Sequence, residues 1–206
     1  MNQSFVFSTA YFPSIYYFYK ILESENILIE KHENYIKQTY RNRCNILTSN
    51  GIMALSIPIK KSISLKTRIT DVEIDYDTNW QQIHLRAIDS AYNSSPFHEY
   101  YIDAFIPFFE KKYKFLFDFN LEILNTIFTE IELNKLISFT SIYEKEIEND
   151  YRNITSPKYE IIDIKIEENK YEQVFSTKFE FTPNMCILDL LFNEGPNTIL
   201  FLESLK

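Results

Sequence analysis

The chain has 206 residues, 45% of them apolar and 24% charged, which is the composition of a folded globular protein and excludes a disordered one. Its length fits a single domain over residues 1–206 with one hydrophobic core. The formal net charge of −8 argues against extended nucleic-acid binding, which needs a basic surface that displaces counterions.

Other classes are excluded by residues that the chain lacks. Cys44 and Cys186 are its only cysteines, and no charged segment followed by an apolar one opens the sequence, so we expect a cytoplasmic protein without a disulfide scaffold. Its apolar runs are far shorter than the roughly 20 residues of a membrane span. The two glycines, Gly51 and Gly195, are too few for a Gly-rich phosphate loop.

The first part of the chain is predicted to alternate strands and helices. Val6-Phe7 reads as a short buried strand, the aromatic run Ile15–Leu22 as a helix after a break at Pro13, and Ile27–Ile29 as a β-branched strand. Asn50-Gly51 predicts a hairpin with a type I′ turn, which requires positive φ at both central residues.

The later part is predicted to be mainly helical. Residues 80–92 have the clearest helical period, and Ser95-Pro96 marks the start of the next helix. Asn120 and Asn184 are predicted to cap two more helices, and Gly195 to end the last long one.

These elements predict an α/β fold, a single-domain layered mixed sheet that is largely parallel, contains one β-hairpin and is flanked by helices. The predicted strands are residues 5–8, 27–31, 44–48, 52–59 and 137–141, with weaker candidates at 72–75 and 161–166. The predicted helices are residues 14–24, 80–92, 97–112, 120–135, 185–194 and a short terminal one from 197 to 205.

Residues 35–43 are the densest group of polar side chains in this acidic sequence. Lys37, Arg41 and Arg43 are cations, and Asn42 adds an amide. The planar fork of arginine suits a carboxylate or phosphate, so these four residues are candidates for binding an anionic substrate. The alternative is a solvated surface loop, because charge runs are usually surface features.

Trp80 and His84 lie four residues apart on the apolar side of the predicted helix, which points the imidazole inward. His84 is the candidate catalytic base and Trp80 a candidate substrate contact; the alternative is a hydrogen-bonded core histidine. No metal site is expected, because no carboxylate or second histidine stands at ligand spacing from His84.

Asp189 and Asn193 form a lone polar stripe on an otherwise apolar helix. They either make an internal hydrogen-bond network or line a cleft. We predict that this stripe, His84 and the cationic segment converge on one cleft, since a shared concave site would satisfy all these polar groups. His84 would have to be neutral at the working pH.

Several motifs are similar to those of a known family. They are Tyr11-Phe12-Pro13, Lys37–Arg43, Trp80-x-x-x-His84, Tyr92-x-x-x-Pro96-Phe97 and Pro183–Pro196. Together they resemble the WbqC-like family, a bacterial family associated with gene clusters for O-antigen lipopolysaccharide and other surface polysaccharides. The chain departs from many members between Thr140 and Tyr171, where charged residues replace a Gly-rich segment, and this puts the substrate in doubt.

The resemblance implies a transferase that places an aminoacyl group such as glycine, or a related acyl group, on a sugar precursor. It identifies no cofactor. The alternatives are a non-catalytic protein that binds an anionic metabolite and another enzyme that uses a sugar nucleotide. The expected partner is a small anionic or sugar-derived molecule, while the donor, the acceptor and the oligomeric state are left open.

Overall fold

The computed structural model describes residues 4–61, 64, 66–164 and 166–205. In this part of the chain, three parallel strands form one sheet in the order β1-β2-β5: β1 (Ser4–Phe7), β2 (Asn26–Ile29) and β5 (Ile137–Phe139). Their last residues are in register, because Phe7 pairs with Ile29 and Ile29 with Phe139. The carboxyl ends of all three strands therefore lie side by side.

A β-hairpin of β3 (Arg43–Thr48) and β4 (Gly51–Ser56) forms a separate two-stranded antiparallel sheet. The α/β class, with parallel strands and a hairpin among helices, is confirmed. The turn differs from the predicted type I′: Gly51 has φ 95°, whereas Asn50 is not among the described residues with positive φ. A type I turn followed by a glycine at positive φ is the common alternative.

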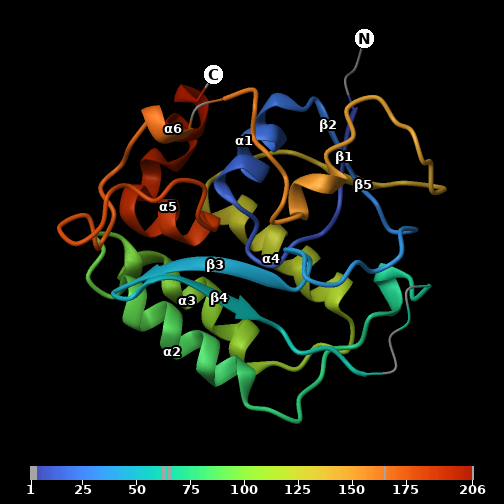
Figure 1. Ribbon diagram of the computed structural model, residues 1–206, viewed down its shortest axis with the longest axis horizontal. Coiled ribbons are helices and arrows are strands. Elements are labelled where there is room, and N and C mark those ends of the chain that lie inside the picture. The colour runs from blue at the N-terminus through green and yellow to red at the C-terminus, as the bar shows by residue number, and fades with distance from the viewer. Residues whose placement is uncertain (1–3, 62–63, 65, 165, 206) are drawn as a thin grey trace.

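The helices pack in two groups (Figure 1). α1 (Ile15–Glu23) contacts α5 (Ile187–Glu194) and α6 (Thr198–Ser204), while α2 (Trp80–Tyr92), α3 (His98–Glu110) and α4 (Leu116–Glu130) follow one another. The strand β3 contacts both α2 and α5, and α3 also contacts α5, so the two groups pack against each other beside the hairpin. Short 3₁₀ helices cover Ile69–Asp71, Arg152–Thr155, Ile166–Glu168 and Gly195–Asn197.

Two predicted helix caps have other roles. Asn120 lies inside α4, where it is buried and donates to the backbone oxygen of Arg41 at 2.7 Å. Asn184 does not cap α5, which begins after Cys186; its Oδ1 accepts from the backbone N–H of Tyr16 at 2.9 Å and so caps α1. Local propensity marks the polar residue but not the helix that it caps.

The two weaker strand candidates are wrong. Residues 72–75 have only isolated bridges, Ile74 with Ile59 and Glu73 with Phe115, and so form no continuous ladder. Residues 161–164 are irregular, residue 165 lies outside the described residues, and a 3₁₀ helix follows. The terminal helix is confirmed as α6.

Candidate functional site

The carboxyl edge of the parallel sheet collects polar residues. Ser8, Glu30 and Thr140 are the first residues after β1, β2 and β5, and all three are buried. In open α/β sheets, ligands bind in the crevice outside the carboxyl ends of the strands. This edge is therefore the place in the fold where a functional site is expected.

A buried ion pair lies at this edge. Arg41 is 2% exposed and binds Glu33 through two parallel hydrogen bonds, Nε to Oε1 at 2.8 Å and a terminal nitrogen to Oε2 at 2.7 Å. The guanidinium also donates to Ser8 Oγ at 2.7 Å and to Thr155 Oγ1 at 2.8 Å. Such a fork fixes both the position and the plane of the guanidinium.

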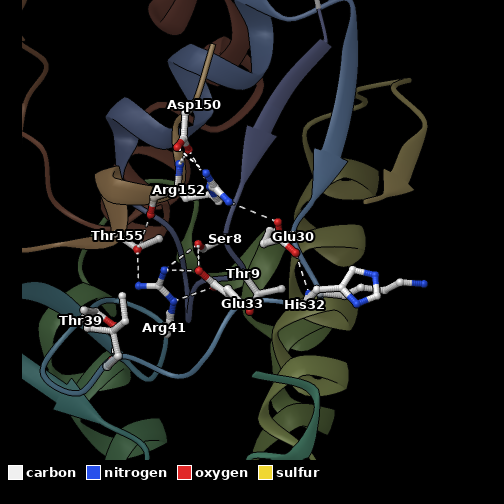
Figure 2. Close-up of polar contacts among 12 residues, drawn as sticks. Ser8, Thr9, Glu30, His32, Glu33, Thr39, Arg41, Asp150, Arg152 and Thr155 are labelled. Atoms are coloured by element: carbon white, nitrogen blue, oxygen red, sulfur yellow. Dashed lines mark hydrogen bonds and ion pairs between the residues drawn. The ribbon is translucent and has the colours of Figure 1, made fainter. Parts of the chain in front are cut away.

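A second group surrounds Glu30, which is 0% exposed (Figure 2). Its carboxylate accepts from the backbone N–H of His32 at 2.6 Å, from Thr140 Oγ1 at 2.9 Å and from Arg152 at 3.3 Å. Arg152 also binds Asp150, and its backbone oxygen accepts from Thr155 Oγ1 at 2.8 Å. Thr155 therefore joins the two groups into one network, the ionic cluster, which consists of Ser8, Glu30, Glu33, Arg41, Thr140, Asp150, Arg152 and Thr155.

Hydrogen bonds within the ionic cluster stabilise the charged forms of Asp150 and Arg152. Burial raises the pKa of Asp150, but the hydrogen bonds from Arg152 outweigh burial and hold it below its usual range. The same hydrogen bonds raise the pKa of Arg152. Both side chains are thus held in their charged forms.

A hollow of about 230 Å³ adjoins the ionic cluster, lined by His32, Glu33, Asn34, Ile36 and Tyr143. It brings a carboxylate, an amide, an imidazole and an aromatic ring together beside the sheet edge. Figure 2 shows His32 turned away from the two arginines.

The structure separates the four residues predicted to bind an anion. Arg41 is buried against Glu33, so its guanidinium already binds a carboxylate of the protein. Asn42 donates to the backbone oxygen of Ile57 and accepts from Tyr35. Arg43 is half-buried and contacts Ser56 Oγ at 3.2 Å, and Lys37 is exposed.

His84 is buried in an aromatic setting. Its Nδ1 lies 3.0 Å from the Tyr11 hydroxyl, and its ring packs edge-on against Trp80. Burial lowers the pKa of His84 from 6.5 to about 4, although a hydrogen bond to the backbone of Ser56 opposes this. The ring is therefore neutral at neutral pH, and it is bonded to Tyr11 and to the Ser56 backbone.

Asp189 and Asn193 belong to another buried network. Asp189 Oδ2 accepts from Tyr171 and, at 2.7 Å, from Gln173. Burial raises the pKa of Asp189, although hydrogen bonds from Tyr171 and Gln173 oppose this. Asn193 donates back to the Asp189 carbonyl at 2.7 Å. Both residues are held inside the protein.

Across the described residues, hydrogen bonds and ion pairs leave Arg41, His84 and Asp189 in three different groups. Their convergence on one cleft stays a prediction. Among these residues there is also no group of three or more His, Cys, Asp or Glu side chains that could hold a metal ion. Nor do they include a helix long and apolar enough to cross a membrane.

Residues 9–156 match the model of the WbqC-like protein family. The chain belongs to this family. It is also 23% identical over 223 residues to the uncharacterized protein Rv1507c of Mycobacterium tuberculosis, and the match covers 95% of each chain. No solved structure matches it. The WbqC-like match includes every residue of the ionic cluster except Ser8, and it excludes α5 and α6.

Sequence reasoning missed Glu30, His32, Glu33 and Arg152 as site residues. The available signal was positional, because Glu30 directly follows the β-branched run Ile27–Ile29 and the carboxyl ends of parallel strands meet at one edge. Arg152 gave no such signal, since it lies in the charged stretch between Thr140 and Tyr171, where no strand end is predicted.

Proposed function

We propose that this WbqC-like protein is a cytoplasmic transferase that moves an aminoacyl or related acyl group onto a sugar precursor of a bacterial surface polysaccharide. The observation that carries the proposal is the ionic cluster at the carboxyl edge of the parallel sheet, next to a polar hollow. Family membership supports the biosynthetic setting.

A catalytic site accounts for the burial of these charges better than a purely structural role. Removing a carboxylate or guanidinium from water costs several kcal/mol, and hydrophobic residues of similar size often serve stability equally well. Buried, fully hydrogen-bonded charges at a sheet edge are typical of sites that need fixed geometry.

The charge balance of the ionic cluster also suggests where each of the two substrates binds. In the ionic cluster two guanidinium groups face the three carboxylates of Glu30, Glu33 and Asp150, so no excess positive charge remains for an anion. We therefore assign a neutral acceptor to the hollow. The anionic donor is assigned to exposed cations, first Lys37, which follows the hollow residue Ile36 in the chain.

A thermal-shift screen followed by turnover assays tests the proposal. The panel contains glycine, acyl-CoA, ATP and nucleotide sugars, and a ligand at 100 times its Kd adds about 2.7 kcal/mol of stability. A compound that stabilises the protein should do so less in Lys37→Ala, whereas Lys170→Ala, which removes another exposed lysine, should behave like the unmodified chain. Stabilisation by an anionic metabolite without turnover would favour the binding-protein alternative.

A further inference from the structure

Two walls of the hollow are fixed by one buried group, the Glu30 carboxylate. Oε1 accepts from the backbone N–H of His32 and from Thr140 Oγ1, at 2.6 and 2.9 Å. Oε2 accepts from Arg152, whose guanidinium carbon lies 5.0 Å from the centre of the Tyr143 ring. The imidazole and aromatic sides of the hollow are thus positioned from inside the protein before any ligand enters.

His32 is the histidine whose ring is open to a ligand. Its Nε2 lies 3.1 Å from the backbone oxygen of Thr140, and because a carbonyl only accepts, Nε2 carries the proton and Nδ1 the lone pair. Within the described residues no protein group bonds Nδ1. His84, by contrast, is buried with bonds to Tyr11 and the Ser56 backbone, and His98 is only 5% exposed.

We propose that His32 is the general base of this site, an assignment that rests on the proposed transfer function. A hydroxyl or amine of the acceptor attacks the carbonyl carbon of an activated acyl donor, and His32 Nδ1 takes the proton of that nucleophile. As the bond from the carbonyl carbon to the leaving group breaks, the proton passes from Nδ1 to the leaving group. The hydrogen bond from Nε2 to Thr140 keeps the ring oriented.

The walls of the hollow indicate a single neutral sugar ring as acceptor. Its volume of about 230 Å³ is below the roughly 300–1,000 Å³ of pockets for drug-sized ligands. Asn34 offers an exposed amide for ring hydroxyls, and Tyr143 offers an aromatic face for the apolar face of a sugar. The balanced charges of the ionic cluster favour a neutral ring over a phosphorylated one.

Chemical labelling tests whether His32 Nδ1 is accessible, and it needs no substrate. Brief treatment of the full chain with diethyl pyrocarbonate, followed by peptide mass spectrometry, should modify His32 at least about tenfold faster than His84 and His98, because only His32 presents an accessible lone pair. Faster modification of His84 or His98 would overturn the assignment, whether or not the protein turns over any substrate.

Turnover of a matched pair of variants tests the catalytic role. His32→Gln keeps a donor for the Thr140 carbonyl but removes the base, so kcat should fall by about 10²–10⁴ while KM changes little. His98→Gln, at a buried histidine outside the hollow, should retain turnover per folded molecule. Unchanged kcat in His32→Gln together with a similar fall in His84→Gln would transfer the role of base to His84. Absence of turnover by the unmodified chain counts against the transfer function alone, and the labelling then still decides whether His32 is the open histidine.

Discussion

At the scale of single residues, the Glu33–Arg41 pair shows why the partner of a cation cannot be identified from sequence. Charge runs are usually solvated, yet Arg41 is buried because its partners come from distant parts of the chain: Ser8 lies 33 residues away and Thr155 lies 114 residues away. The residue type and its affinity for a carboxylate were predictable. That the carboxylate belongs to the protein itself was not, because tertiary contacts decide it.

Substitutions of Glu33 and Arg41 should be strongly coupled in their effects on the free energy of unfolding. Glu33→Gln leaves the buried Arg41 charge without its counter-ion, which should lower the free energy of unfolding by about 3–5 kcal/mol. The double variant Glu33→Met with Arg41→Met should cost less than the sum of its single variants. Urea unfolding measures both, with Arg43→Gln as the half-buried control expected to lose less than about 1 kcal/mol. An unchanged urea midpoint for Glu33→Gln would show that the pair is not coupled.

His84 should make stability depend on pH. Its pKa is lowered to about 4 in the folded protein, against 6.5 for an exposed histidine, so between these values the unfolded chain binds a proton that the folded chain does not. Stability is therefore full above pH 6.5 and decreases as the pH falls towards 4, by on the order of 3 kcal/mol. Unfolding measured from pH 4 to 7 should show a smaller loss in His84→Gln; equal losses in both proteins would contradict this origin.

At the scale of elements, hydrophobic periodicity located the main helices and strands, while their ends depended on contacts that the pattern does not contain. The predicted helix at residues 120–135 instead spans Leu116–Glu130. Asn120 is predicted to cap a helix because amides favour caps, but it is buried and donates to the Arg41 backbone oxygen. The predicted hairpin pairs over six positions from Arg43 to Thr48, since alternation and the glycine at the turn are local signals.

The two glycines should differ in what they tolerate. Both have positive φ, 95° at Gly51 and 53° at Gly195, so alanine strains the backbone at each by about 1–3 kcal/mol. A Cβ at Gly51 would meet nothing within 4 Å, whereas one at Gly195 would lie 2.5 Å from the Phe97 ring. Gly195→Ala should therefore cost about 1–3 kcal/mol more than Gly51→Ala.

A second substitution tests whether the Phe97 ring is what limits residue 195. Adding Phe97→Ala to Gly195→Ala removes the ring atoms that the new Cβ would meet, so this pair should show a favourable coupling in a double-variant cycle of unfolding free energies. If Gly51→Ala and Gly195→Ala unfold at the same midpoint, the close approach of Phe97 does not limit this position.

At the scale of the whole molecule, the predicted class was correct, although the hairpin forms its own sheet. Sequence signals specified each strand but not which strands would share an edge, because long-range pairing depends on packing. The sheet of β1, β2 and β5 nevertheless accounts for the position of the site. The last residues of its three strands are in register, so the polar residues that follow them lie side by side. The buried apolar residues from β1 to α6 form one cluster, and this cluster extends well beyond the family match at residues 9–156.

The segment that matches the family model lacks a large part of the core. α5 lies outside residues 9–156, yet Ile187, Leu188, Leu190, Leu191 and Phe192 are all 0% exposed. Each fully buried side chain of this kind contributes about 1.5–3 kcal/mol, so together they contribute as much as the 5–15 kcal/mol of a typical domain's net stability. A chain ending at residue 156 should therefore not fold by itself.

Backbone hydrogen bonds reinforce this expectation. The segment before α5 is bound to the N-terminal part of the chain, with Cys186 N–H donating to Asn45 O at 3.1 Å and Ile15 N–H donating to Met185 O at 3.0 Å. Residues 1–156 should show neither near-ultraviolet circular dichroism nor a cooperative urea transition, and addition of residues 157–206 as a separate polypeptide should restore both. Cooperative unfolding of residues 1–156 alone would mean that the family segment is an independent folding unit and that α5 only covers it.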